Sequence, residues 1–463
     1  MSFLVVLAAL LLLMFVAYRG YSVILFAPLV AMLAVLATDP GAVPAVFTGI
    51  FMERVAGFLK LYFPVFLLGA VFGKLIELSG FSQSIASTVI RLVGQERAIL
   101  AIVLVCALLT YGGVSLFVVV FAVYPFAAEL FRRGNIPKRL VPGTIALGAF
   151  TFTMDALPGS PQIQNIIPTT FFGTDTWAAP TLGVIGAIFI LATGLTYLEW
   201  RRRQAVTTGE GYGSGHVLEP ESPALARESG AIVAVLPLVV VGIANLALTR
   251  LIPRWNDATI TTDLQGLAQP LVTQLSSVTA IWAVQGALLA GIATVLLFAF
   301  RPVIRRFIEG TKAAVGGAML AALNTASEYG FGAVIAALPG FLFVKEALMA
   351  IPNPLVNEAI TVTTLAGITG SASGGMSIAL AAMSEQFIAA ANSAGIPLEV
   401  LHRVASMASG GMDTLPHNGA VITLLAVTGL THRQSYRDIF AITCIKTLAV
   451  FVVIATYYAT GLV

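Results

Sequence analysis

The sequence predicts an all-α polytopic membrane protein built as an inverted repeat of two five-helix units, each with a re-entrant hairpin and a broken helix. Of the 463 residues, 58% are hydrophobic and 10% are charged, whereas a soluble domain has roughly 25% charged residues. Apolar runs of about 20 residues, enough to cross a membrane, recur along the chain. The motif TMDALPGSPQ at 153–162 resembles GMDTLPHNGA at 411–420, which indicates duplication. A soluble α/β core is excluded because these apolar segments lack polar faces.

Charge and cysteine content exclude several classes of protein. The net charge of +3 is small and scattered, so no nucleic-acid partner is expected. Cys106 and Cys444 lie in apolar segments and are expected to pack there, with no disulfide, metal site or cofactor. Arg19 follows the first apolar run instead of preceding it, so we expect a retained helix and not a secretory signal. Lys74 and Glu77, three residues apart, are expected to form a local ion pair.

The duplication extends over the whole chain. Matching pairs occur in the same order in both halves: Phe72-Gly73 with Phe331-Gly332, Gly80-Phe81 with Gly340-Phe341, GGVS at 112–115 with GGMS at 374–377, Ile136-Pro137 with Ile396-Pro397, and Asp155 with Asp413. Residues 201–229 are rich in Gly, Ser, Pro and Glu, which predicts a solvated cytoplasmic linker. The first repeat is therefore expected at 1–200 and the second at 230–463.

Basic residues indicate that the two repeats are inverted relative to each other. The segment at about 98–130, with GGVS near its middle, has basic residues on both sides: Arg91, Arg97, Arg132, Arg133, Lys138 and Arg139. Lysine and arginine favour the cytoplasmic side, so this segment is expected to leave and return to that face as a re-entrant hairpin. Its counterpart at about 356–393, around GGMS, lacks such flanks and is expected to open to the outside.

Threading the chain around these hairpins gives an odd number of crossings in each half, as inversion requires. The expected crossings are 3–19, 22–38, 58–78, a broken one at 139–172, 179–199, 230–250, 276–300, 314–338, a broken one at 397–431, and 439–461. The basic clusters at 201–203, 301–306 and 432–437 then lie inside, and both termini lie outside.

Prolines break the two crossings that carry the aspartate motifs. Proline removes a backbone donor and clashes with the preceding turn, so DALPGSP and DTLPHNG cannot stay helical. Irregular backbone at membrane depth is tolerated only where it is buried or lines a cavity. Each break leaves a half-helix N-terminus that can bind a carboxylate. Inverted repeats with broken helices and a midplane site are the pattern of secondary transporters.

Carboxylates near the breaks are the expected coupling residues. Asp155 and Asp413 are costly inside a membrane, which indicates proton or coupling-ion binding, although each could instead only cap the half-helix that follows. His417 could take up a proton, bond to substrate or be merely structural. Glu328, on the helix before the second hairpin, is a secondary coupling candidate whose alternative is a hydrogen-bonded, inward-facing residue.

Small and polar residues of the tips and breaks are the expected substrate contacts, because glycine lets backbone approach a ligand closely. The set is Gly112, Gly113, Ser115, Gly159, Ser160, Gln162, Asn165, Ser373, Gly374, Gly375, Ser377, His417 and Asn418. The amides of Gln162, Asn165 and Asn418 are expected either to select a substrate hydroxyl or to satisfy the broken backbone. Neither tip and neither break contains a lysine or arginine, so backbone N–H groups would supply the positive field, which favours a monocarboxylate.

Four long segments resemble one transporter family. They are FGKLIELSGF, TYGGVSLFVVVFAVYP, TMDALPGSPQIQNIIPTTFFGT and GMDTLPHNGAVITLLAVTGLTHRQSY. Over nearly its whole length the chain is similar to the gluconate:proton symporter (GntP) family of the ion transporter superfamily. The resemblance implies a homodimeric importer of small hydroxy-carboxylates in the bacterial cytoplasmic (inner) membrane. It also implies proton symport and an elevator, with a scaffold domain and a mobile transport domain that carries both hairpins. YGGVSLFVVVFAVYP looks closer to members labelled hydroxybutyrate or citrate permeases, so a 3-hydroxybutyrate-like acid or a sugar acid is expected.

Three other functions stay open at this point. A sodium-coupled carboxylate or citrate transporter would use the Ser/Gly tips as sodium cages. A passive channel would show no ion-driven accumulation. An intramembrane aspartyl protease would carry Gly-x-Gly-Asp, but Thr153-Met154 and Gly411-Met412 precede the two aspartates. We therefore expect a transporter and not an enzyme.

Overall fold

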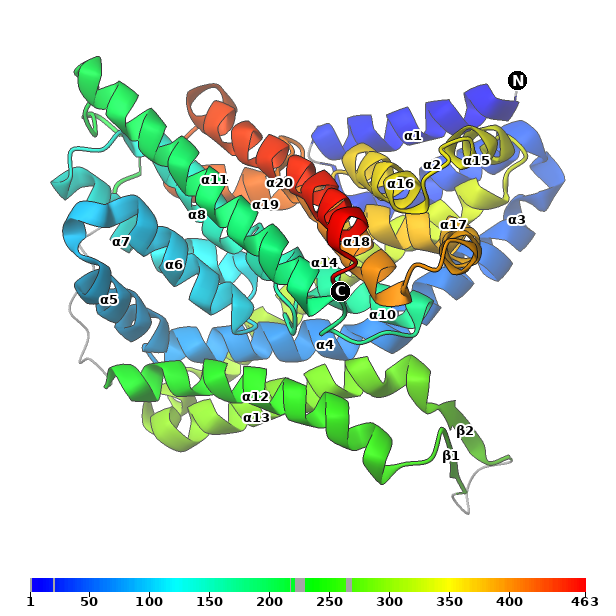
Figure 1. The fold of residues 1–463 in the computed structure, drawn as a ribbon, viewed down its shortest axis with the longest axis horizontal. Helices are drawn as coiled ribbons and strands as arrows, with labels where there is room; N and C mark the ends of the chain where they lie inside the picture. The colour runs from blue at the N-terminus through cyan, green and yellow to red at the C-terminus, as the bar shows by residue number, and fades with distance from the viewer. Residues whose placement is uncertain (1, 20, 217, 221–229, 264–268) are drawn as a thin grey trace.

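The computed structural model describes residues 2–463 except residues 20, 217, 221–229 and 264–268, and these residues are mostly helical (Figure 1). Within the described residues, five helical stretches are long and apolar enough to cross a membrane, or up to seven if two bent helix pairs each count as one span. The all-α prediction is wrong in one detail. Strands β1 (Thr259–Thr262) and β2 (Leu271–Gln274) form an antiparallel pair between two long helices.

Helices of the first half lie close to the expected crossings. They are α1 (Ser2–Tyr18), α2 (Val23–Thr38), α3 (Val43–Val46), α4 (Glu53–Leu78), α5 (Phe81–Val93), α6 (Ala98–Tyr111), α7 (Leu116–Arg133), α8 (Val141–Ala149), α9 (Phe152–Asp155), α10 (Ile163–Phe172) and α11 (Pro180–Thr207). Short 3₁₀ turns at Pro40–Ala42, Gln95–Arg97 and Lys138–Leu140 and a π-helix at Phe47–Met52 join some of them. The third crossing therefore begins well before residue 58. Lys74 Nζ lies 2.7 Å from Glu77 Oε1, which confirms the predicted ion pair.

Helices of the second half follow the same order. They are α12 (Ala231–Trp255), α13 (Leu275–Ile304), α14 (Phe307–Ala337), α15 (Phe341–Met349), α16 (Pro354–Thr369), α17 (Ala372–Ser393), α18 (Leu398–Gly410), the 3₁₀ turn η5 (Gly411–Thr414), α19 (Gly419–Thr428) and α20 (His432–Thr460). The last helix begins at the basic cluster instead of after it. Cys106 is buried as expected, whereas Cys444 on α20 is exposed, so its predicted packing role is wrong for the isolated chain.

One helix of the first half was not predicted from sequence. α5 precedes the first hairpin and is bent by 110° from α6. Gly94 lies at the bend with a φ of 91°, a conformation that glycine adopts without strain. The hairpin α6–α7 thus begins from a helix that lies across it.

The helices form two groups that meet along α4, α13 and α14. In the first group, α12 packs on α13, α13 on α4, α4 on α14, and α14 on α2. In Figure 1, α12 and α13 lie together beneath α4. The second group contains both hairpins, both broken crossings, α11 and α20. We name these the outer group (α2, α4, α12, α13, α14) and the hairpin group (α6–α11, α16–α20).

An ion-pair cluster ties together the ends of α8, α11 and α20. Asp438 is 1% exposed and accepts from Arg201 Nε at 2.7 Å and from Arg139 Nη1 at 3.0 Å. Tyr197 Oη also donates to Asp438, at 2.9 Å. Arg201 is therefore a buried structural cation and not part of a solvated linker.

The described part of the linker packs against the base of the first hairpin. Lys138, whose side chain is fully buried, donates to Leu218 O at 2.5 Å and to Glu219 Oε1 at 2.9 Å. Arg139 makes two hydrogen bonds to the Glu210 carboxylate, at 2.6 and 2.7 Å. Glu210, Leu218 and Glu219 of the linker are exposed, but they also bond to the base of the hairpin. Residues 221–229 lie outside the described residues.

Candidate functional site

Two helix breaks and two hairpin tips define the candidate site. The chain leaves helical geometry near the prolines, as their missing donors require. We name these segments the first tip (112–115), the first break (156–162), the second tip (370–371) and the second break (415–418).

Hydrogen bonds join each tip to the break of its own half. In the first half, Gln162 Nε2 donates to Thr110 O, just before the first tip, at 2.7 Å. In the second half, Asn418 Nδ2 donates to Gly370 O at 2.8 Å. The tips therefore end at the irregular backbone of the breaks, where a ligand could contact both.

Asp413 connects the two halves. Its Oδ2 accepts from Gln164 Nε2, at the start of α10, at 2.8 Å. Its Oδ1 accepts from the Ala372 backbone N–H and from Asn418 Nδ2, both at 3.3 Å. Ala372 is the first residue of α17, and a helix N-terminus stabilises a carboxylate. Asp413 thus contacts the start of a hairpin helix. The N-cap of the half-helix α19 is Asn418 and not Asp413, so the capping alternative does not apply to Asp413.

Asp155 forms a buried ion pair with a lysine that sequence reasoning missed. Lys446 Nζ on α20 lies 3.2 Å from Asp155 Oδ2, and both side chains are 1% exposed. The ammonium group also donates to Phe150 O at 2.6 Å and to Gly410 O. Asp155 therefore does not cap α10, and the expectation of a site without cations is wrong. The sequence signal was a single lysine inside an otherwise apolar crossing, which is a functional candidate by default.

Arg403 is a second buried cation beside the first break. It is 0% exposed on α18, and its Nη1 donates to Asp155 O at 2.9 Å and to Asn165 Oδ1 at 3.0 Å. Its Nη2 donates to Ala178 O at 2.7 Å. The guanidinium group thus satisfies backbone carbonyls freed by the break, a use that its fan of donors suits.

The three predicted amides are occupied in this conformation. Asn165 Nδ2 donates to Ser160 O at 3.0 Å and to Thr176 O at 2.8 Å. Gln162 and Asn418 donate to the backbone near the tips, as described above. Of the two hypotheses for these residues, the arrangement seen here matches satisfaction of the broken backbone.

Glu328 on α14 reaches the second tip. It is 4% exposed and lies near Ser371, and its Oε2 has no hydrogen-bond partner among the described residues. A methyl group on Gly374 would lie 1.7 Å from that oxygen, so only glycine leaves room for the carboxyl group. Ser373 Oγ lies 3.2 Å from Thr325 Oγ1 on the same helix as Glu328. Glu328 therefore faces the tip and is an interior residue.

Several buried polar atoms near the tips and breaks have no hydrogen-bond partner in the described part of the chain. They are Thr110 Oγ1, Gln164 Oε1, Trp177 Nε1, Glu328 Oε2, Ser377 Oγ, His417 Nε2 and both carboxyl oxygens of Asp155, whose charge is nevertheless paired with Lys446. Buried polar atoms in native proteins are nearly always hydrogen-bonded, so unpaired ones call for a ligand, a water or a proton. These atoms come from both halves and give the site unused hydrogen-bond donors and acceptors for a polar ligand.

The glycines of the tips pack closely against protein atoms. A methyl group on Gly112 would lie 2.5 Å from Leu238, and one on Gly375 would lie 2.1 Å from the backbone of α16. Gly113 has a φ of 96°, which turns the chain between α6 and α7. Ser115 precedes α7 at the N-cap position, and its side chain makes no capping hydrogen bond. In this conformation the glycines serve close packing of the hairpins.

Residues of the first break are also held by neighbouring protein. Gly159 has a φ of 75°, and a methyl group there would lie 2.4 Å from the Trp177 ring. The hydroxyl of Ser160, which is fully buried, donates to Thr153 O at 2.6 Å. The first break is therefore a rigid turn.

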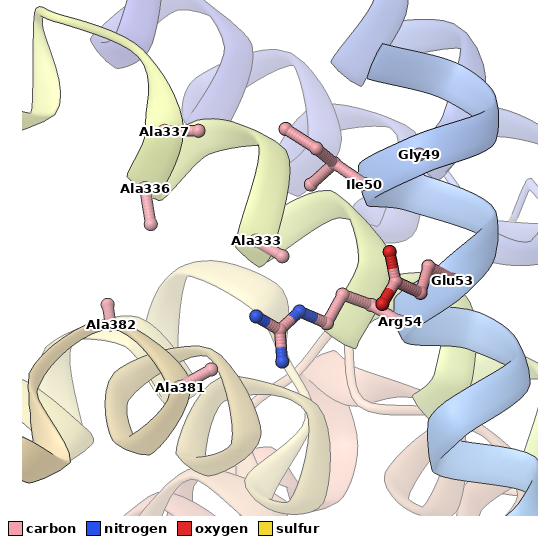
Figure 2. A pocket seen from close by; sticks show the side chains of 9 residues that line it. All are labelled: Gly49, Ile50, Glu53, Arg54, Ala333, Ala336, Ala337, Ala381 and Ala382. Carbon is pink, nitrogen blue, oxygen red and sulfur yellow. The ribbon is translucent and has the colours of Figure 1, made fainter. Parts of the chain in front are cut away.

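A separate pocket of about 340 Å³ lies between the outer group and the second hairpin. In Figure 2 the Arg54 side chain extends from the start of α4 toward Ala333 on α14 and Ala381 on α17. The other residues that line the pocket are Gly49, Ile50, Glu53, Ala336, Ala337 and Ala382. The two groups of helices are thus separated by small side chains and open space at this end.

Comparisons with known proteins agree with a transporter. A profile of the GntP family permeases matches residues 1–288. A Bacillus subtilis protein described as "Uncharacterized transporter YxjC" is 60% identical over 472 residues, and the alignment covers all of both chains. A Haemophilus influenzae protein described as "Uncharacterized transporter" is 31% identical over 203 residues, covering 43% of this chain and 44% of that one.

A solved structure shares the fold. The crystal structure of the Alcanivorax borkumensis YdaH transporter, reported to have an unusual topology, aligns with a TM-score of 0.52. The alignment covers 91% of this chain and 90% of that one at 15% sequence identity, so the likeness concerns the fold alone. Together with the matching profile and the full-length relative, the membrane-spanning helices identify a multi-pass membrane protein. The chain belongs to the GntP permease family of secondary transporters.

Proposed function

We propose that this protein imports a small hydroxy-monocarboxylate by proton symport, with the substrate bound between the tips and the breaks. The observation that carries the proposal is a set of buried ionisable groups from both halves at this place. They are the carboxyl groups of Asp155, Asp413 and Glu328 and the cations of Lys446 and Arg403. Ionisable residues inside a membrane typically mark ion and substrate pathways.

The charge balance of these five groups supports coupling to protons. Three carboxylates and two cations sum to a net charge of −1 when all are ionised. A monocarboxylate would raise this to −2 in a low-dielectric interior, where like charges repel strongly. One proton bound by a carboxylate brings the sum back to −1, and two bring it to zero. Glu328 is the best proton acceptor, because it forms no ion pair among the described residues and its Oε2 has no hydrogen-bond partner there.

The site also suits a substrate with one carboxylate and a hydroxyl group. The N-termini of α10 and α19 offer backbone N–H groups and a partial positive charge to the carboxylate. Ser377 Oγ and His417 Nε2 have no hydrogen-bond partner among the described residues and can bond to a hydroxyl group. A di- or tricarboxylate would add negative charge that these groups do not balance. We rank a 3-hydroxybutyrate-like acid first, followed by a sugar acid.

Alternating access would follow from the duplicated architecture. We propose an inverted repeat of residues 1–200 and 230–463 around the linker at 201–229, with the outer group as scaffold and the hairpin group as the mobile part of an elevator. The alanine-lined pocket between the two groups supports this, since small side chains leave the interface smooth. We further propose a homodimer in the bacterial inner membrane, with both termini outside.

Transport by the purified protein in liposomes tests the proposal. Uptake of labelled 3-hydroxybutyrate in sodium-free buffer should accelerate when the outside is made more acidic. Butyrate, which lacks the hydroxyl group, should compete weakly, because unpaired polar atoms in the site penalise it. Uptake that requires sodium and ignores the pH gradient would contradict proton symport, and exclusive competition by citrate would contradict the substrate class.

A sodium-coupled carboxylate transporter is the second candidate. Glu328 Oε2 and Gln164 Oε1 have no hydrogen-bond partner among the residues that the structure describes. The Gln164 side chain donates to Asp413, and Glu328 lies near Ser371 of the second tip. Oxygen atoms of this kind suit a hard cation. Thermal stabilisation of the protein by sodium, but not by potassium, would favour this candidate.

A further inference from the structure

A further acidic residue is buried in the second hairpin, away from the candidate site. Glu358 lies in the second turn of α16, and its side chain is 0% exposed. Neither of its carboxyl oxygens has a hydrogen-bond partner among the described residues. The proposed substrate site does not use this residue, so its burial needs a separate explanation.

Glu358 occupies a position in the apolar contact face of the hairpin. Leu355 lies three residues before it and Val362 four after it, and both are 0% exposed. Residues at such spacings lie on neighbouring positions of one helix face. α16 packs along α17 and α18. The carboxyl group is therefore surrounded by the packing of the hairpin and has no access to water.

Charged groups on the elements packed against α16 do not compensate Glu358. α1 also packs against α16, but it has no titratable side chain among the described ones. The described titratable side chains of α15, α17, α18, η5 and α20 are Glu346, Glu385, Glu399, His402, Arg403, Asp413, His432, Arg433, Tyr436, Arg437, Asp438, Cys444, Lys446, Tyr457 and Tyr458. The structure shows no hydrogen bond or ion pair between any of these described groups and Glu358. The buried cations Arg403 and Lys446 bond at the breaks instead.

The second tip is also too far away to help. Glu358 precedes Gly370 by 12 residues of helix, or about 18 Å at 1.5 Å per residue. Glu358 and the cluster around Asp413 and Glu328 are therefore separate ionisable sites on the same hairpin.

An unpaired carboxylate in such surroundings is far more costly than a neutral carboxylic acid. We propose that Glu358 is an additional proton-binding site of the transport cycle. It is protonated in the conformation described here and releases its proton when the hairpin moves and water reaches its face of α16. This inference rests on the proposed proton symport.

The proton-to-substrate ratio tests this inference. Wild-type protein, Glu358→Gln and Glu385→Gln are reconstituted, and accumulation of labelled 3-hydroxybutyrate is measured at a fixed pH gradient and zero membrane potential. Glu358→Gln keeps the shape of the protonated side chain, so substrate counterflow should persist while one proton fewer is carried. Steady-state accumulation should then fall about tenfold for each pH unit of gradient. Glu385 is exposed on the same hairpin, and its variant should behave like the wild type.

Infrared difference spectroscopy gives a readout that does not depend on transport. The wild type and Glu385→Gln should show a carboxylic-acid C=O band that Glu358→Gln lacks. Glu358→Leu, which suits the apolar face, provides a second variant if the glutamine variant does not fold. An unchanged proton-to-substrate ratio in both Glu358 variants, or no loss of the C=O band, would overturn the inference. Wild-type uptake that ignores the pH gradient would instead contradict the proposed function, while the band would still report whether Glu358 is protonated.

Discussion

Lys446 Nζ lies 3.2 Å from Asp155 Oδ2, and each side chain is 1% exposed, although the two residues come from opposite halves of the chain. Lys446 also donates to the carbonyl groups of Phe150 and Gly410. The ammonium group therefore joins the first broken crossing, the end of α18 and the last helix at one buried point. Removing either charge leaves the other without compensation in the interior.

Lys446→Met should destabilise the protein strongly, by roughly 3–5 kcal/mol, because a buried carboxylate loses its counter-charge. Asp155→Asn combined with Lys446→Met should recover much of this loss, since the pair is then neutral. Thermal unfolding in detergent, followed for the wild type, both single variants and the double variant, measures the coupling between the two residues. Additive effects of the two substitutions would show that the ion pair does not act as a unit.

Gly410→Ala should destabilise the protein by about 1–3 kcal/mol, as overpacking of an interior does. A methyl group there would lie 1.6 Å from Asp155 Oδ2, so the ion pair with Lys446 must shift. Gly316→Ala is the matched control, because no atom lies within 4 Å of its added methyl group on α14. The control should be neutral or slightly stabilising. Equal unfolding temperatures for the two variants would contradict the close approach of Asp155 to α18.

The contact between Arg139 and Glu210 should make stability depend on pH on the acidic side. The hydrogen bonds from Arg139 hold the pKa of Glu210 below its ordinary value. A group with a lowered folded pKa stabilises the protein above its unfolded pKa of about 4.3, and this contribution is lost as pH falls through the folded pKa. The unfolding temperature should therefore fall less steeply between neutral and acidic pH for Glu210→Gln than for the wild type. The difference should be small, because Glu210 is partly exposed. Identical pH profiles would show that this linker contact does not persist in solution.

Periodicity and proline positions predicted most of the helices but not the charges that meet between them. The crossings at 22–38, 179–199 and 276–300 correspond closely to α2, α11 and α13, because apolar length is a local property of the chain. Arg403 and Lys446 lie far from the first aspartate motif in sequence and reach the first break only through packing of α18 and α20. A search confined to the tips and breaks could not find them, whereas a search for lone charges in apolar helices would have found Lys446.

Composition did not predict the contacts of the linker, and it did not predict α5. Glycine, serine and glutamate at 209–219 predicted solvation, and Glu210 and Glu219 are exposed, but Glu219 also pairs with the buried Lys138. Such pairing depends on where the first hairpin ends in space, which no local pattern records. The polar residues between 81 and 93 obscured α5, which packs against α6 and α7 of the hairpin and against α12 and α4.

Opposite openings of the two hairpins can be tested by labelling cysteines with an impermeant maleimide in intact cells, in a background lacking Cys106 and Cys444. Cysteine at Ser393, which follows the second hairpin, should react without permeabilisation, whereas cysteine at Arg133, at the end of the first hairpin, should react only afterwards. Both positions are exposed, so access is set by the membrane and not by packing.

Cysteine at Ser214 in the linker is the control. Because Arg132 bonds to Glu219 at 3.1 Å, positions 133 and 214 must lie on one face whatever the orientation of the protein. Reaction of positions 133 and 393 from the same side would contradict the inverted repeat, whereas a difference between 133 and 214 would contradict the fold at the first hairpin.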